Sequence, residues 1–257
     1  SMKKTLPLIL FILSSYSYAQ ITHKNIEAVR TKENPIIDGV LEPELWSKAP
    51  KARNWSQIEP RNSEAERSNQ RSEVQFIYDD KALYVGALFY DTTPDSILRE
   101  FSLRDEWDKN CDWFGVWIAP YNDAQNDFMF ALTATGVQLD ARSSGEDSDM
   151  NWNAVWKSAV QIHDKGWSAE IEIPYSALRI PNTEIQQWGI NIRREIRRTR
   201  ESYSWNPIDI SKSNYRAQAG VLTGIKNTKA PLRLSLMPYV SSYLGFYESE
   251  RNSHING

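Results

Sequence analysis

The chain is almost free of cysteine, because Cys111 is the only one among its 257 residues. A single cysteine cannot form an internal disulfide, and no histidine or second cysteine lies at metal-ligand spacing from it. We therefore expect Cys111 to be a buried thiol that packs like a small hydrophobe. The three histidines, His23, His163 and His254, lie in no Ser/His/Asp or Cys/His arrangement typical of a hydrolase.

Neither sign of charge dominates, since the chain has 30 Lys and Arg and 33 Asp and Glu, and its formal net charge is −3. Nucleic-acid binding usually needs a basic field, so this balance argues against a nucleic-acid partner. Basic residues gather only locally, at Arg193, Arg194, Arg197, Arg198 and Arg200. We interpret this arginine cluster as one solvated or salt-bridged strand face.

The apolar run at residues 6–13 is too short for a membrane-spanning helix, which needs about 20 residues. Lys3 and Lys4 precede the run, and small and polar residues follow it as far as Ala19. This order is typical of a cleavable signal peptide. We predict a signal peptide over residues 1–19, with a buried first helix as the alternative. No cysteine lies at the expected cleavage site, so a lipid anchor is not expected there.

Aromatic residues are abundant, with 10 Trp and 12 Tyr, which is too many for a disordered chain. Apolar segments are short and often alternate with polar residues, which is typical of strands. Residues 50–72 are polar and irregular, and we interpret them as a long surface loop. We predict strands over residues 74–78, 82–90, 112–119, 128–132, 157–163, 167–173, 188–195 and 220–225, and short helical turns at 42–49, 94–98 and 175–178.

The segment 167–173 shows the alternation most clearly. Its odd positions are apolar, whereas Ser168, Glu170 and Glu172 occupy the even positions, as in a half-buried strand. Many short strands separated by Gly, Asp, Asn and Pro predict a sandwich or a barrel. The tail at 229–257 differs, because Leu232, Leu234 and Leu236 alternate with other residues before an aromatic-rich stretch. It is either the first strand of a membrane β-barrel or an edge strand of the preceding domain.

Five segments occur in the order found in a known family of modules. They resemble carbohydrate-binding module family 9 over about residues 26–226, and the resemblance implies an all-β fold, an antiparallel β-sandwich with few short helices, at 20–228. The segments are residues 35–42 with Trp46, 78–85, 112–120, 166–174 and 188–193.

Three further motifs, at residues 205–207, 220–224 and 238–239, look like a group of Bacteroidetes-type outer-membrane proteins. In that group this domain precedes a C-terminal β-barrel of unassigned role. The resemblance implies export to the periplasm or outer membrane of a Gram-negative bacterium. It also implies that the C-terminal β-barrel of a longer chain is a partner and links this domain to the outer membrane.

The family resemblance implies saccharide binding, in which two Trp side chains sandwich a sugar ring. Trp107 and Trp205 lie nearest the two expected places, and Trp152 and Arg142 complete the candidate ligand-binding residues. The strand that faces the ligand carries long polar side chains in sugar-binding members. Here the matching positions are Met129, Ala131 and Thr133, so donors that a sugar needs are missing.

Residues 145–153 form an acidic segment that we interpret as a loop. Asp147, Asp149 and Asn151 alternate there and offer oxygen ligands that suit Ca²⁺, although the spacing is not that of an EF-hand. Calcium is therefore the only cofactor that the sequence indicates, and a solvated acidic loop is the alternative.

Two classes of function stay open. The first is a non-catalytic carbohydrate-binding domain of an exported cell-envelope protein. The second is a structural, gating or partner-binding domain beside an outer-membrane β-barrel, without sugar binding. A glycoside hydrolase is a minor alternative, because it needs two carboxylates across a cleft and no catalytic constellation is recognisable.

Overall fold

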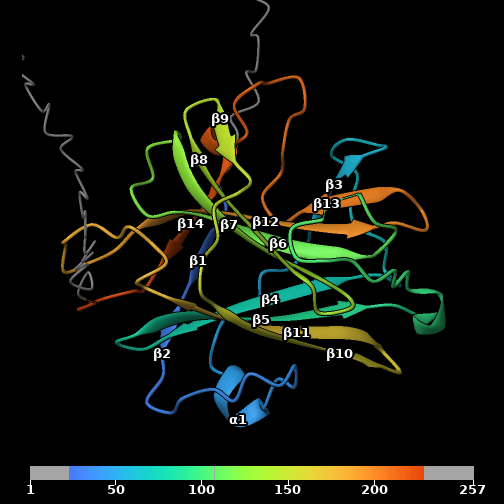
Figure 1. Ribbon diagram of the computed structural model, residues 1–257, viewed down its shortest axis with the longest axis horizontal. Helices are drawn as coiled ribbons and strands as arrows, with labels where there is room; N and C mark the ends of the chain where they lie inside the picture. The colour runs from blue at the N-terminus through green and yellow to red at the C-terminus, as the bar shows by residue number, and fades with distance from the viewer. Residues whose placement is uncertain (1–22, 107, 229–257) are drawn as a thin grey trace, which may run out of the picture.

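The computed structural model describes residues 23–106 and 108–228, whose regular structure is almost entirely β-strand. Two sheets, of nine and five strands, stack as layers (Figure 1). This arrangement confirms the predicted β-sandwich. Within the described ranges no helix is both long and apolar enough to cross a membrane.

The five-stranded sheet has the order β10-β11-β5-β4-β2. The strands predicted over 74–78 and 82–90 pair as the β4–β5 hairpin, and those over 157–163 and 167–173 as the β10–β11 hairpin. In the β4–β5 turn, Asp79 Oδ1 accepts hydrogen bonds from the backbone N–H of Lys81 at 2.7 Å and of Ala82 at 2.8 Å. The strands are β2 (Val29–Arg30), β4 (Ser72–Tyr78), β5 (Ala82–Tyr90), β10 (Lys157–His163) and β11 (Gly166–Pro174).

The nine-stranded sheet has the order β1-β14-β12-β6-β7-β8-β9, and β13 joins β12 to β3 beside this path. Most pairs are antiparallel, but β1 pairs with β14, and β2 with β4, in parallel. The strands are β1 (Asn25–Glu27), β3 (Ser56–Glu59), β6 (Trp113–Ala119), β7 (Asn126–Thr133), β8 (Gln138–Ser144), β9 (Asp147–Asp149), β12 (Trp188–Ile196), β13 (Glu201–Ser204) and β14 (Gly220–Thr223).

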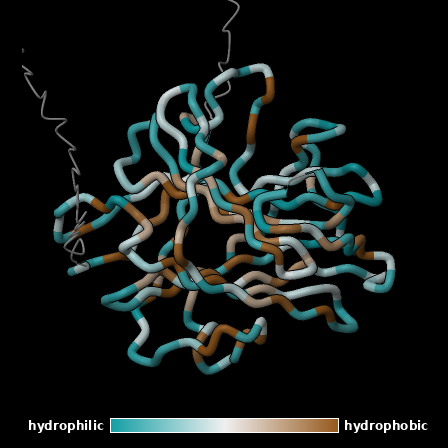
Figure 2. Tube along the Cα trace, viewed as in Figure 1, coloured by the Kyte–Doolittle hydropathy of each residue, from teal (hydrophilic) through white to brown (hydrophobic). Residues whose placement is uncertain are grey.

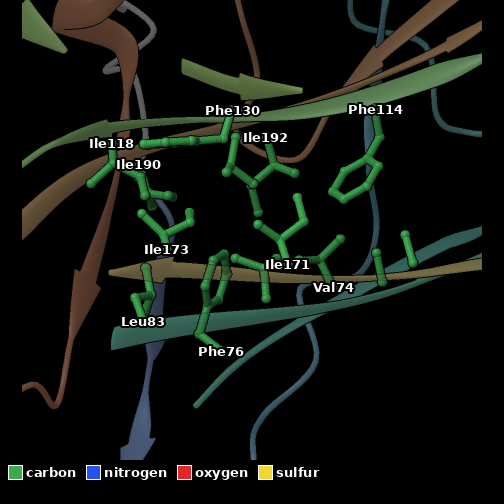
Figure 3. Close-up of a cluster of buried hydrophobic side chains, with 14 of the residues drawn as sticks. Val74, Phe76, Leu83, Phe114, Ile118, Phe130, Ile171, Ile173, Ile190 and Ile192 are labelled. Atoms are coloured by element: carbon green, nitrogen blue, oxygen red, sulfur yellow. The ribbon is translucent and has the colours of Figure 1, made fainter. Parts of the chain in front are cut away.

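The core fills the space between the two sheets, where the hydrophobic stretches of the trace meet (Figure 2). Alternate residues of each strand point into it, and the two inner faces interdigitate (Figure 3). Each such side chain contributes about 1.5–3 kcal/mol when it is fully buried. The side chains include Val74, Phe76, Leu83, Ile171 and Ile173 from the five-stranded sheet and Phe114, Ile118, Phe130, Ile190 and Ile192 from the nine-stranded sheet.

The outer face of the five-stranded sheet is also buried, because the segment around α1 (Pro43–Trp46) covers it (Figure 1). Glu170 on β11 holds this segment. Its carboxylate accepts hydrogen bonds from the backbone N–H groups of Asp38 and Gly39 and from Trp46 Nε1, each at 3.1 Å. The strand predicted at 167–173 is present as β11, but the prediction that it is half-buried is wrong, since Ser168 and Glu170 are buried as well.

Two segments predicted as loops contain strands. Residues 50–72 include β3, and Trp55 beside it is buried with its ring edge-on to Phe89, 6.4 Å between centroids. Residues 145–153 include β9, which pairs with β8. Both strands are short and polar, so neither shows a hydrophobic period.

The other helical elements are single turns, η1 (Pro94–Ser96) and η2 (Arg216–Gln218), and the segment 175–178 is a turn without a helix.

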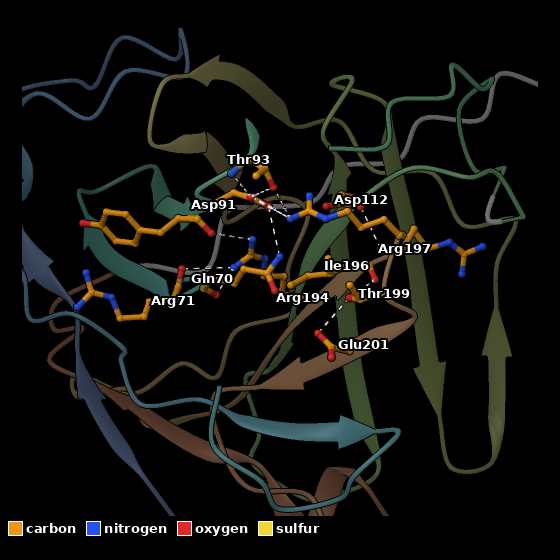
Figure 4. A network of polar contacts seen from close by, with 12 residues as sticks. Gln70, Arg71, Asp91, Thr93, Asp112, Arg194, Ile196, Arg197, Thr199 and Glu201 are labelled. Carbon is orange, nitrogen blue, oxygen red and sulfur yellow. Dashed lines mark hydrogen bonds and ion pairs between the residues drawn. The ribbon is translucent and has the colours of Figure 1, made fainter. Parts of the chain in front are cut away.

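The arginine cluster does not share one face. Arg193 and Arg197 do bridge Glu195 on the outer side. Arg194 instead points inward and is fully buried, where it donates to the carbonyls of Gln70 at 2.7 Å and Tyr90 at 3.2 Å (Figure 4). Strand alternation explains the correction, because neighbouring residues point to opposite faces.

Two carboxylates lie near this buried guanidinium. Asp91 pairs with Arg198 at 2.6 Å, and Asp112 accepts the backbone N–H of Arg197 at 3.0 Å (Figure 4). Burial raises the pKa of Asp112 to about 6, and burial also lowers the pKa of Arg194 to about 10. Cys111, next to Asp112, is buried as expected.

Candidate functional site

A groove of about 730 Å³ lies on the outer face of the nine-stranded sheet. Strands β6, β7 and β12 supply its floor, and the β8–β9 turn and the loop 205–219 form its walls. Both walls rise from the sheet on the side away from the five-stranded layer (Figure 1). We call this hollow the outer-face groove. It is built by segments far apart in the sequence, so its shape depends on the whole sandwich.

Two tryptophans of β6 point to the outer face because Phe114, Val116 and Ile118 occupy the core face. The rings of Trp113 and Trp117 lie 6.4 Å apart with an interplanar angle of 55°. Gly115 stands between them, and the Trp117 ring lies so closely over this glycine that a side chain there would force the ring to shift by a few tenths of an ångström. The Trp117 indole therefore forms part of the groove floor.

Met129 and Ala131 of β7 lie beneath these indoles, together with Leu139 and Ala141 of β8. They are buried, with at most 4% of Met129 exposed. Of the three positions expected to lack polar donors, Met129 and Ala131 lie in this apolar cluster, and Thr133 is also buried. Aromatic faces from the neighbouring strand cover this cluster.

Polar groups line the groove beside Trp117. Asn191 Nδ2 donates to the Tyr215 carbonyl at 3.4 Å, whereas its Oδ1 has no partner within the described residues. The Arg193 guanidinium lies 5.6 Å from the centre of the Trp113 ring, and its Nε is likewise unpaired there. Both unpaired atoms are themselves buried, so the exposed part of the Arg193 guanidinium is the donor that a ligand hydroxyl can reach.

An ion pair joins the floor of the groove to its wall. Asp127 of β7 accepts a hydrogen bond from Arg216 Nε at 2.9 Å. Burial raises the pKa of Asp127, and the Arg216 charge opposes that rise. Arg216 also donates to the carbonyl of Gly145 at 2.9 Å, so it fixes the loop 205–219 against the β8–β9 turn.

The loop 205–219 presents a second aromatic ring and two aliphatic side chains to the groove. Tyr215 and Ile210 are each 49% exposed, and Ile208 lies deeper in the wall. The Trp117 indole on the floor and the Tyr215 phenol on the wall both border the outer-face groove. This combination suits a ring with an apolar C–H face and polar edges, such as a pyranose sugar.

Trp205 does not have the role predicted for it. Its side chain is only 4% exposed and packs in the core against Gly220. The backbone N–H of Trp205 donates to the Ile192 carbonyl at 3.0 Å, which continues the β12–β13 pairing and points the indole inward. Trp205 therefore offers no face to a ligand, and Tyr215 is the exposed aromatic residue of this loop.

The other predicted ligand residues lie elsewhere. Trp107 lies outside the described residues. Trp152 and Arg142 border a separate hollow at the edge of the sandwich and do not reach the outer-face groove. The Trp152 ring packs against Phe128, with 5.4 Å between centroids. The sequence thus grouped residues that belong to different places.

Asp149, one of the three candidate calcium ligands, is already engaged by protein groups. Asp149 Oδ2 pairs with Arg142 at 3.0 Å, and its Oδ1 accepts the backbone N–H of Asn151 at 3.2 Å. Asp147 is exposed on β9. Within residues 23–106 and 108–228, no group of three or more His, Cys, Asp or Glu side chains could hold a metal ion. Calcium binding at this segment stays a prediction.

One signal in the sequence pointed to Trp117. In the segment 113–118 the core residues are Phe114, Val116 and Ile118, so the period of two places Trp113 and Trp117 together on the other face. Two large aromatic residues flanking a glycine on an outward face indicate a platform. Tyr215, Asn191 and Arg193 carried no comparable signal, because their meeting depends on the path of the loop 205–219.

Solved structures with the same architecture include carbohydrate-binding modules. One is a family 9 module from Caldicellulosiruptor kristjanssonii in complex with cellotriose, with a TM-score of 0.55 and 15% identity, covering 84% of this chain and 100% of that one. The complex of such a module with glucose has a TM-score of 0.56 and 14% identity, covering 81% and 100%. A Bacteroides uniformis protein proposed to bind carbohydrate has a TM-score of 0.60 and 12% identity, covering 79% and 99%.

At these identities the structures establish the fold alone. A search of curated proteins finds no significant match. The family described as "Carbohydrate family 9 binding domain-like" matches residues 37–202, which is more than half of the chain and includes the floor of the outer-face groove. The chain therefore belongs to the carbohydrate family 9 binding domain-like family.

Proposed function

We propose that this domain binds a saccharide in the outer-face groove without cleaving it. The observation that carries the proposal is the Trp117 indole lying over Gly115 on the floor of a groove of about 730 Å³. A sugar ring stacks its C–H face on such an indole. Tyr215 offers a second ring on the wall, Asn191 is a polar residue of the lining, and the partly exposed Arg193 guanidinium supplies hydrogen-bond donors for hydroxyls.

The two Caldicellulosiruptor kristjanssonii complexes suggest the first ligands to try, glucose and cellotriose. We expect millimolar to micromolar binding, measured by calorimetry and by intrinsic Trp fluorescence. Trp117→Ala and Tyr215→Ala should each lower the affinity about tenfold or more, because each removes a stacking face. No heat and no fluorescence change with any mono- or oligosaccharide at millimolar concentration would refute the proposal.

Phe101→Ala is the matched control for loss of an exposed ring. Phe101 is 79% exposed and lies outside the groove, so its loss should leave saccharide affinity unchanged. Far-UV circular dichroism and thermal unfolding of each variant separate lost binding from lost folding, which matters for Trp117 because it also covers the apolar cluster under it.

A partner-binding or gating domain beside an outer-membrane β-barrel is the second candidate function. Phe101 and Leu103, which are 79% and 74% exposed, favour it because large apolar side chains on a loop suit contact with another protein. An expressed longer chain would test it. If Phe101→Ala and Leu103→Ala weakened the contact with that barrel while no sugar bound, this role would replace the first.

We also propose export to the periplasm or outer membrane. The proposal rests on the signal-peptide pattern of residues 1–19 and on the tail 229–257, both outside the described residues. Expression of the full sequence in a Gram-negative host, followed by cell fractionation and N-terminal sequencing, would test it. Recovery in the cytoplasm with residues 1–19 still attached would contradict it.

A further inference from the structure

A second hollow, of about 220 Å³, opens at the edge of the sandwich and shares no lining residue with the outer-face groove. Strands β7 and β8 form one side, where Phe128 and Arg142 are directly paired. Trp152, which follows β9, and Arg179, in the connection after β11, form the others. We call it the Arg142–Arg179 hollow.

The charge of this hollow is one-sided. Two guanidinium groups line it, and no carboxylate of the described residues does. Arg142 uses one terminal nitrogen for Asp149, at 3.0 Å, and its remaining donors have no partner among the described residues. Arg179 is exposed and makes no hydrogen bond or ion pair within that part of the chain. Guanidinium groups bind carboxylates through two parallel N–H donors, so the hollow is suited to an anionic group.

An aromatic face accompanies the two charges. Trp152 is half-buried, and its indole is held by Phe128 at 5.4 Å and by Phe130 at 6.0 Å between ring centroids. The contacts fix the ring in place before any ligand arrives, which lowers the entropy cost of binding. Asn153 and Ser176 add uncharged polar groups at the rim.

The hollow continues into a larger one of about 630 Å³, which shares Phe128, Arg142 and Arg179 with it. The larger hollow is lined by hydroxyl, amide and carboxylate groups, among them Ser143, Asn126 and Asp147. These side chains suit the hydroxyl groups of neutral sugar units. An occupant would thus carry its negative charge at the arginines and its uncharged units along β8 and β9.

We propose that the Arg142–Arg179 hollow binds the carboxylate-bearing ring of an acidic saccharide, that is, a hexuronate unit. The ring stacks against Trp152, and its carboxylate lies between the two guanidinium groups. This site is separate from the outer-face groove, and either one functions without the other.

The test compares galacturonate and glucuronate oligosaccharides with glucose oligosaccharides by calorimetry on the mature protein. We expect acidic oligosaccharides to bind, and Arg179→Gln to weaken them about tenfold, because it removes a charge-assisted hydrogen bond. Arg99→Gln is the matched control, since Arg99 is an exposed arginine remote from this hollow and should change nothing. Because Arg179 is exposed, its loss leaves the fold intact, which circular dichroism checks.

Three further outcomes decide the proposal. Trp117→Ala should weaken binding of neutral sugars about tenfold or more and leave uronate affinity unchanged, so failure of the groove and failure of this hollow are distinguishable. If Trp117→Ala removed uronate binding, the acidic sugar would lie in the groove and the proposal would be overturned. It would also be overturned if Arg179→Gln bound uronates like the wild type, or if acetate alone competed as strongly as a uronate at equal concentration.

Discussion

The ring of Trp117 lies over Gly115 so closely that a Cβ at residue 115 would stand 3.2 Å from the indole Cζ3. The same Cβ would approach Ala131 Cβ to 2.9 Å. The absence of a side chain at one position of β6 thus decides where the aromatic floor of the outer-face groove lies. If this floor binds a sugar, residue 115 controls affinity without touching the ligand.

Gly115→Ala should lower saccharide affinity about fivefold, because the methyl group displaces the Trp117 ring from its place on the sheet. Calorimetry with cellotriose measures the effect. The double variant Gly115→Ala/Ala131→Gly removes the second close contact and should regain stability but not affinity. Full recovery of affinity in the double variant would show that Trp117 had not been displaced.

Glu170 links pH to stability through the segment that it holds. Burial raises its pKa from the ordinary 4.5 to about 7, against the opposing effect of its three hydrogen bonds. Between these two values the folded protein keeps a proton that the unfolded chain releases. The free energy of unfolding should therefore fall as the pH rises from about 4.5 to 7, and level off above.

Glu170→Gln isolates this effect. At pH 5 the variant should be less stable by about 1–2 kcal/mol. Its amide N–H₂ is a donor, and it would face the backbone N–H groups of Asp38 and Gly39 or the Trp46 indole N–H, which are donors themselves. Its disadvantage should shrink by pH 8, where the wild type has lost the stability of its bound proton. Urea unfolding of both proteins from pH 5 to pH 8 measures the difference, and a constant difference would show that Glu170 does not titrate in this range.

Arg194→Met should lower the free energy of unfolding by about 3–5 kcal/mol, because it leaves buried carbonyls without their donor and buried carboxylates without a nearby positive charge. Gln70 and Tyr90 would lose hydrogen bonds to their carbonyls, and Asp112 would lose a nearby positive charge. The adjacent Arg193→Met is the matched control, since it points to the outer face and should cost under about 1 kcal/mol. Equal losses in urea unfolding would contradict the buried role of Arg194.

The sequence predicted the long strands well because each carries its own signal. The run 82–90 and the alternation at 167–173 became β5 and β11. The short polar strands β3 and β9 carried no period and were missed. β3 pairs with β13, which lies far away in the sequence, and β9 pairs with β8, which is itself largely polar.

The site was less predictable than the fold. Trp113 and Trp117 could be assigned to one face by alternation, but their approach depends on Gly115. Whether Trp205 or Tyr215 reached the surface depended on how far β13 continues to pair with β12, which residue types alone do not determine. Arg179 joined Arg142 only because the turn after β11 lies beside β8, a relation between residues 37 positions apart.

Trp205 gives a direct test of the corrected site. Because its indole is buried in the core, Trp205→Ala should lower the free energy of unfolding by about 3–5 kcal/mol. Trp205→Phe keeps most of the buried volume and should leave saccharide affinity within twofold of the wild type. At residue 215, Tyr215→Phe should keep the stacking face, whereas Tyr215→Ala should lose it. Calorimetry on the four variants separates the two aromatic residues. Loss of binding in Trp205→Phe, with the fold retained, would return Trp205 to the ligand site.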